Sequence, residues 1–150
     1  MAVDLKLTKD PATGLFDLTI KNGDFALVDS FDTSIIVSLF SDQRADASEV
    51  PASESRRGWW GDQFGDDPTF RSGSKLWLLD QARNTQETLN SAIDFSSDSL
   101  QWFIDENHIE NIEITGESTS TGITLKEIFF RDQSRVDTKF FDLWENSGAV

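Results

Sequence analysis

Carboxylates are the side chains of this sequence most able to carry out chemistry. Two carboxyl groups that flank a sugar ring can hydrolyse a glycosidic bond, and acidic chains with tryptophans include such enzymes. The candidate acids here are Asp62, Asp66, Asp67, Asp105 and Glu106. With 27 Asp and Glu among 150 residues, several candidates are expected by chance, and their spacing singles out no pair. A glycan hydrolase is therefore the alternative hypothesis and not the leading one.

The remaining chemistry is limited by what the sequence lacks. Cys is absent, which excludes disulfides, thiolate sites and a structural zinc site built on Cys. The only histidine, His108, follows an expected helix end, where an imidazole more often interacts with the helix dipole than acts as a base or metal ligand. No phosphate-binding loop, dinucleotide motif, nucleophile elbow or EF-hand spacing occurs. We predict no catalytic residues, no metal and no cofactor.

The run RRGWWGDQF, from Arg56 to Phe64, places two adjacent tryptophans between two glycines. Burial of one Trp removes roughly 150–250 Å² from water, so such side chains are seldom left exposed without a purpose. Trp59 and Trp60 can pack on the protein's own core, or they can anchor a partner together with Arg56 or Arg57, because Trp and Arg dominate interface hot spots. A ligand pocket is a third possibility. The sequence leaves these interpretations open.

Charge narrows the choice of partners. The net charge of −14 and the pI near 4.2 create a negative field that repels nucleic acids and anionic membranes. Between residues 84 and 125 there are eight acids and no Lys or Arg, whereas six of the 13 basic residues lie between 44 and 83. A basic segment and an acidic segment in one chain can pair between copies or with neighbours.

No signal peptide or membrane span is expected. The first ten residues carry charges and no apolar run, and no segment approaches 18 apolar residues. We therefore expect synthesis in a cytoplasm.

The N-terminal residues predict a β-meander. Leu5 and Leu7 alternate with a polar residue, and the segment from Phe16 to Ile20 alternates in the same way, so each strand should bury one face. Asn22-Gly23 is a strong hairpin signal that leads into a third strand, residues 25–28.

After the meander, the apolar residues have the spacing of helices. Ser30 can cap a first helix through Phe40, and a long loop without a period covers residues 42–71. Ser72 or Ser74 can cap a short helix that extends to about Arg83. Asn84 with Glu87 resembles a capping box, and a longer helix should then run to about Ile104.

Three strands should complete the chain, and a flexible tail covers residues 145–150. The predicted strands are Ile109–Glu117, Ile123–Phe130 and Thr138–Trp144. Strands followed by helices and further strands indicate an α+β fold, with an N-terminal β-meander, two or three helices and C-terminal antiparallel strands. We predict a single domain over residues 1–150.

Four motifs occur together in this order: SIIVSLFSDQRA, RRGWWGD, GSKLWLL and LQWFIDE. In this arrangement the chain resembles the Mu-like phage baseplate wedge family, which is related to the sheath initiators of contractile tails. The resemblance spans roughly residues 25–117 and extends loosely to Trp144. Where the wider initiator group often carries Glu-Pro-Arg after its long helix, this chain reads DENH, so the contact made by that arginine is in doubt. Arg56 or Arg57 are the candidates to replace it.

The resemblance implies a non-enzymatic α+β subunit in the virion, at the point where the baseplate meets the first sheath ring. Its partners would be other wedge proteins, the tail sheath protein, and tube or hub proteins, with several copies in a symmetric assembly. Neighbouring chains would join by β-augmentation through residues 139–144 or 3–8. The alternative under this resemblance is a tail-associated, lysozyme-like peptidoglycan hydrolase. The partner interface predicted here comprises Arg56, Arg57, Trp59, Trp60, Asp62, Lys75, Trp77, Phe140 and Trp144.

Overall fold

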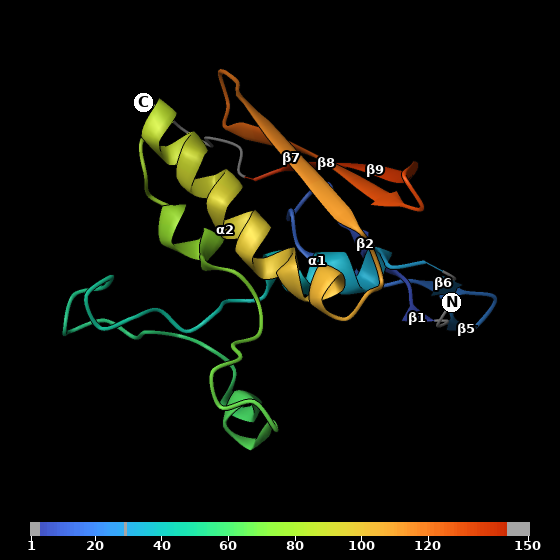
Figure 1. Cartoon of the computed structure of the whole chain (residues 1–150), viewed down its shortest axis with the longest axis horizontal. Coiled ribbons are helices and arrows are strands. Elements are labelled where there is room, and N and C mark those ends of the chain that lie inside the picture. The colour runs from blue at the N-terminus through green and yellow to red at the C-terminus, as the bar shows by residue number, and fades with distance from the viewer. Residues whose placement is uncertain (1–3, 29, 144–150) are drawn as a thin grey trace.

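The computed structural model of the chain describes residues 4–28 and 30–143, and it confirms the α+β class (Figure 1). A three-stranded antiparallel sheet lies beside two α-helices, and short N-terminal strands pack at one end. The helices are α1 (Asp32–Phe40) and α2 (Gln86–Asp105), and the sheet has the order β7 (Asn111–Ser118), β8 (Ile123–Arg131) and β9 (Ser134–Asp142). Among the described residues, no helix is both long and apolar enough to cross a membrane.

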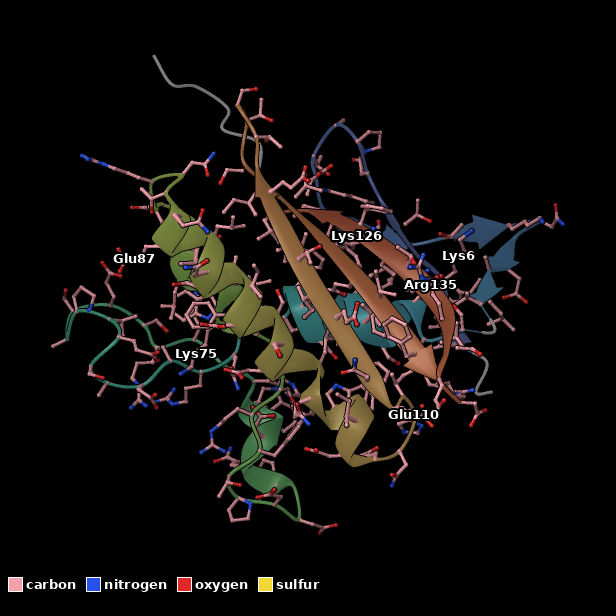
Figure 2. The ribbon with its side chains drawn as sticks, turned by 45° about the horizontal axis from the view of Figure 1, so that its top comes forward. Lys6, Lys75, Glu87, Glu110, Lys126 and Arg135 are labelled. Carbon is pink, nitrogen blue, oxygen red and sulfur yellow. The ribbon has the colours of Figure 1, made fainter. Side chains whose placement is uncertain are left out.

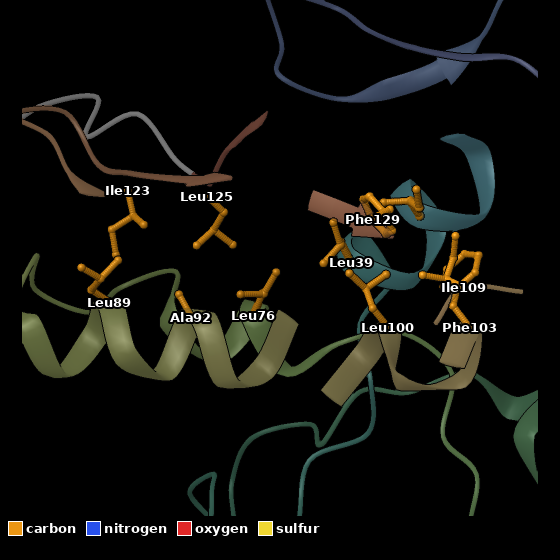
Figure 3. Close-up of a cluster of buried hydrophobic side chains, with 11 residues drawn as sticks. Leu39, Leu76, Leu89, Ala92, Leu100, Phe103, Ile109, Ile123, Leu125 and Phe129 are labelled. Carbon is orange, nitrogen blue, oxygen red and sulfur yellow. The ribbon is translucent and has the colours of Figure 1, made fainter. Parts of the chain in front are cut away.

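The core lies between α2 and the sheet. Leu89 and Leu100 project from the predicted apolar face of α2 toward the side chains of β8, where Ile123 and Leu125 are fully buried (Figure 3). Phe103 extends the same face and contacts Phe31, which precedes α1, in an edge-to-face arrangement with ring centroids 5.4 Å apart. The predicted stripe of α2 is therefore confirmed as the main source of buried apolar surface.

The start of α2 differs from the prediction. Thr85 and not Asn84 caps the helix, because the Thr85 hydroxyl accepts a hydrogen bond from the backbone N–H of Thr88 at 3.2 Å. The Asn84 amide instead donates to the carbonyl oxygens of Thr119 and Gly122, at 2.8 and 3.2 Å. Asn84 therefore ties the start of α2 to the hairpin between β7 and β8, at the turn that the sequence predicts.

The last strand begins four residues earlier than predicted. Asp132 and Gln133 both have positive φ, 51° and 58°, and form a two-residue hairpin turn between Arg131 and Ser134. Paired positive φ values give the turn twist that antiparallel strands favour. Asp-Gln is not a usual sequence signal for this turn, which is why the start of β9 was predicted too late. In contrast, β7 begins at Asn111, two residues later than the predicted Ile109.

The N-terminal strands form three short pairs. β2 (Leu7–Lys9) pairs with β3 (Phe16–Leu18), and β4 (Ile20–Lys21) pairs with β5 (Asp24–Phe25) through the predicted Asn-Gly turn. The third pair joins β1 (Asp4–Leu5) to β6 (Leu27–Val28), so the first and last strands of the expected meander are also in contact.

The prediction of one buried face on these strands is wrong for most of their apolar residues. Leu5, Leu18 and Ile20 are exposed, as are Phe25 and Leu27, and Leu7, Phe16 and Val28 are partly buried. Phe16 reaches the rest of the molecule through the ring of Phe40 at 5.2 Å. Pairs of two or three residues provide no continuous face to pack, so the alternation in the sequence does not produce burial.

The segment between the helices projects away from the sheet as two arms (Figure 1). One arm covers residues 45–56, and the other carries a short 3₁₀ helix, η1 (Trp60–Phe64), near its end. A second 3₁₀ helix, η2 (Lys75–Leu79), follows and is capped by Ser74. The predicted short helix therefore exists but ends before Arg83.

Candidate functional site

An exposed aromatic cluster lies on the second arm of this loop. We call Trp59, Trp60 and Phe64 the tip; their side chains are 58%, 71% and 73% exposed. The ring of Trp60 lies 5.7 Å from that of Trp59 and 5.8 Å from that of Phe64, measured between centroids. Three large aromatic side chains therefore form one continuous surface that faces solvent, and neither tryptophan folds back into the core of the isolated chain.

The two glycines around the tryptophans explain this local shape. Gly58 has a φ of +97°, and a Cβ built there would lie 2.5 Å from the Cβ of Arg44. A Cβ on Gly61 would lie 2.3 Å from the indole ring of Trp59. Gly58 thus permits a turn beside Arg44, and Gly61 leaves room for the Trp59 ring to lie against the backbone.

Asp62 closes the arm that carries the tip. Its Oδ2 accepts the backbone N–H of Ser72 at 3.0 Å, and its Oδ1 accepts the Ser72 hydroxyl at 2.6 Å. The Asp62 side chain is buried. Both carboxylate oxygens hold η1 itself against the returning segment at Ser72, so the role of Asp62 within the chain is to set the geometry of the tip.

The base of the loop is held by Arg57 and Trp77. The Arg57 guanidinium pairs with Asp42 at 2.8 Å and lies 4.4 Å above the centroid of the Trp77 ring. The Trp77 indole N–H donates to the carbonyl of Gln43 at 2.8 Å. A charge pair, a cation–π contact and a hydrogen bond therefore meet where the loop leaves the body.

Lys75 and Arg56 hold the first arm. The Lys75 ammonium lies 3.2 Å from Asp46 and 2.9 Å from Glu49. Burial alone would lower the pKa of Lys75, but the hydrogen bonds to Glu49 and Asp46 raise it above its ordinary value. Arg56 donates through Nε to the carbonyl of Ala45 at 2.7 Å, and its own carbonyl accepts the Ala45 N–H. We refer to residues 42–73, held in this way, as the clamped loop.

A hollow of about 510 Å³ adjoins the tip. Its lining residues are Arg44, Trp59, Trp60, Asp62, Gln63, Pro68 and Arg71. Arg44 donates to the carbonyl of Arg57 at 3.3 Å, and Arg71 donates to the carbonyls of Pro68 and Phe70 at 2.8 Å each. Within the described part of the chain, neither guanidinium forms an ion pair with a carboxylate. The hollow therefore combines aromatic surface with two guanidinium groups, and the one carboxylate that lines it, Asp62, is bound to Ser72.

The remaining predicted interface residues lie elsewhere. Phe140 belongs to β9, is exposed, and has the ammonium of Lys126 5.9 Å from its ring centroid. Figure 1 shows β9 far from η1, so Phe140 is not part of the tip. Trp144 lies outside the described residues. Phe64 was not among the predicted residues; it joins the tip through its ring contact with Trp60. No regular spacing signals this contact, because η1 is a 3₁₀ helix in which residues three apart, and not four, share a side.

Three of the carboxylates considered for catalysis accept hydrogen bonds from other residues of the chain. Asp62 is bound to Ser72, as described above. Asp67 accepts hydrogen bonds from the hydroxyl and backbone N–H of Thr69, which hold the pKa of Asp67 below its ordinary value. Asp105 accepts the Gln101 amide at 3.0 Å, on a different element from Asp62. No group of three residues suited to hold a metal ion occurs within residues 4–28 and 30–143.

His108 lies just after α2, as predicted. Its Nε2 is 3.3 Å from a carboxylate oxygen of Glu106, and its ring packs near Phe31 and Trp102 with centroids 5.6 and 5.8 Å apart. The side chain thus packs against aromatic residues at the helix end. Among the described residues, its ring nitrogens form no hydrogen bond to a Ser or Thr hydroxyl that could act as a nucleophile.

Sequence comparison identifies the family. The family model described as "Phage protein GP46" matches residues 31–135. This chain belongs to the phage protein GP46 family. It is 35% identical over 125 residues to the Mu-like prophage FluMu protein gp46 of Haemophilus influenzae, covering 83% of this chain and 84% of that protein. It is also 35% identical over 111 residues to the baseplate protein gp46 of Escherichia phage Mu, covering 73% and 74%.

The clamped loop lies inside the region that the family model matches. Residues 31–135 extend from α1 to the first residues of β9 and include the whole clamped loop. The N-terminal strand pairs lie outside this match. The resemblance to Mu-like phage proteins inferred from the motifs is confirmed.

Proposed function

We propose that this chain is a non-enzymatic structural subunit of a contractile phage tail baseplate, with the tip as a contact to an adjacent subunit. The relative in phage Mu is a baseplate protein, which supports the location in the virion. The observation that carries the proposal is the exposed aromatic tip held on a clamped loop. Two arginines and one lysine fix the conformation of this loop, although its three aromatic side chains are exposed. A loop that only faces solvent would not need to be held in this way.

The size of the tip is sufficient to contribute to an interface. A large aromatic side chain can bury 150–250 Å², so three that are about two-thirds exposed offer on the order of 300–500 Å². At about 25 cal/mol per Å², complete coverage would contribute on the order of 8–12 kcal/mol before the costs of association. Patches of this size on single chains often serve function. Because the loop is already ordered, less conformational entropy is lost when a partner binds.

The finer assignment is a wedge component that meets the first sheath ring, in several symmetric copies. Its neighbours would be other wedge proteins, the tail sheath protein, and tube or hub proteins. Of the two segments considered for β-augmentation, we propose the one in β9 as the strand that pairs with a neighbouring chain. β9 is nine residues long and forms one edge of its sheet. The N-terminal strands are two or three residues long and already paired with one another.

Substitution of both Trp59 and Trp60 by Ala tests the proposal. Because both rings are exposed, we expect the melting temperature to change by no more than about 1–2 °C, the shift that corresponds to roughly 0.5 kcal/mol. Incorporation into tail particles should fall about tenfold or more, as for loss of a hot spot worth about 1.4 kcal/mol or above. The matched control is Phe25→Ala, which removes an exposed aromatic ring from the N-terminal strands. Unfolding of the double variant, or its normal incorporation, would show that the tip is not an interface.

The peptidoglycan hydrolase alternative has no support from the site geometry, since Asp62 is bound to Ser72 and Asp67 is bound to Thr69. Incubation of the protein with purified peptidoglycan provides the direct test. Turnover that Asp62→Asn or Glu106→Gln abolishes would establish the enzyme and refute the structural role.

A further inference from the structure

The positive charge beside the tip points to an acidic contact surface on its partner. Arg44 and Arg71 line the hollow together with Trp59 and Trp60, and their guanidinium groups donate only to backbone carbonyls in the described residues. An arginine next to an aromatic surface binds a carboxylate well, because the ring surface excludes water from the ion pair while the guanidinium donates two hydrogen bonds. The partner surface should therefore present carboxylates.

The chain itself carries such a surface. The solvent-facing side of α2 has carboxylates at Glu87, Asp94, Asp98 and Asp105, which we call the acidic stripe. The exposed positions between them, Asn90, Ser97 and Gln101, are uncharged. Within the described residues, none of these four carboxylates forms an ion pair with Lys or Arg. The stripe is negative along the whole helix.

The two halves of the stripe lie in different positions relative to the tip. Asp98 and Asp105 line a cleft of about 480 Å³ whose other wall includes Phe70 and Arg71 of the same chain. Glu87 lies at the N-terminal end of α2 (Figure 2). In Figure 1 that end of α2 lies at the top of the view and η1 lies at the bottom. The tip therefore cannot reach Glu87 or Asp94 within one chain, although it can do so in a neighbouring copy.

We infer that the tip of one copy docks on the N-terminal half of α2 of a second copy, with Arg44 and Arg71 facing Glu87 and Asp94. This inference rests on the proposed function, because it names the partner of the tip in a symmetric assembly. A contact between two different surfaces of identical chains is heterologous, and repetition by rotation closes a ring. The net charge of −14 repels free copies, so the contact forms where other subunits hold the copies side by side.

Photocrosslinking in assembled tail particles tests the inference directly. p-Benzoylphenylalanine in place of Trp60 preserves an exposed aromatic side chain, and irradiation should produce an adduct of twice the 16.9 kDa chain mass. Mass spectrometry should locate the link within residues 86–98. A self-adduct linked elsewhere overturns the inference. An adduct with a different protein also overturns it but supports the proposed function, whereas incorporation without any adduct refutes both.

Charge reversal provides an independent test with a built-in control. Arg44→Glu with Arg71→Glu should lower particle yield about tenfold or more, because two charge pairs become repulsive. Addition of Glu87→Lys and Asp94→Lys should restore the yield to within about threefold of the unmodified chain, as expected when complementary charges are exchanged. Glu110→Lys and Glu113→Lys, which reverse exposed acids outside the stripe, should restore nothing. Equal rescue by both pairs would show that only net charge matters and would refute the contact.

Discussion

Replacement of Glu127 by Gln should stabilise the folded chain at pH 8 and remove much of the pH dependence of its stability. Glu127 lies on the central strand β8, and neither of its fully buried carboxyl oxygens has a hydrogen-bond partner among the described residues. Lys139 is its neighbour across the sheet, but the Lys139 ammonium is held by Asp32 at 2.6 Å and Asp137 at 3.2 Å. Burial raises the pKa of Glu127 from 4.5 to about 8.

The direction of the effect follows from this raised pKa. Below pH 4.5 the carboxyl is protonated in both the folded and the unfolded chain, so folding carries no ionisation penalty. Between pH 4.5 and about 8 the unfolded carboxyl is ionised while the folded one keeps its proton, and stability falls as pH rises. Above pH 8 the penalty is complete, with an upper bound on the order of 5 kcal/mol.

Urea unfolding at a series of pH values measures this penalty. The unmodified chain should lose several kcal/mol of unfolding free energy, relative to Glu127→Gln, between pH 5 and pH 8. Glu113→Gln serves as the matched control, because Glu113 is an exposed acid on the adjacent strand β7. If the difference between Glu127→Gln and the unmodified chain stays constant across this range, the folded carboxyl does not titrate as its burial requires and the reasoning fails.

Three further substitutions test the local structure. Gly61→Ala should displace the Trp59 indole, since the new Cβ would lie 2.3 Å from the ring, and a changed near-ultraviolet circular dichroism signal with reduced particle incorporation would confirm it. Thr85→Ala should lower the free energy of unfolding by about 1 kcal/mol through loss of the α2 cap, and an unchanged free energy of unfolding would show that Thr85 is not the cap. Leu100→Ala should cost about 2–5 kcal/mol in chemical unfolding because the side chain is completely buried, and a smaller loss would show that the core is not centred there.

Elements with strong local signals could be predicted from the sequence. The helix α2 follows from its apolar spacing, and Ser74 was one of two serines proposed to cap the short helix that follows the loop. The hairpins at Asn22-Gly23 and before Ile123 carry turn residues whose φ preferences are well defined. In each case the local preference and the final packing agree.

Elements without such signals could not be predicted correctly. The start of β9 depends on a turn formed by Asp132 and Gln133, residues that adopt positive φ less readily than Gly or Asn. The exposure of Leu5 and Ile20 depends on how little of the N-terminal strands touches the rest of the molecule, which the alternating pattern cannot report. Tertiary packing decides both features.

The candidate site shows the same division. The sequence singles out the tryptophans and the surrounding arginines, but it does not separate residues that hold the loop from residues that face outward. The structure assigns Arg56, Arg57, Asp62, Lys75 and Trp77 to contacts within the chain and leaves the tip exposed. Arg44 and Arg71, which flank the hollow, become visible only when the chain folds.

An electron-microscopy reconstruction of the assembled tail baseplate tests the central claim most directly. The account predicts that atoms of a neighbouring chain cover Trp59, Trp60 and Phe64, with the clamped loop in the conformation described here. A reconstruction in which all three rings remain in solvent, or pack only on their own chain, would contradict it.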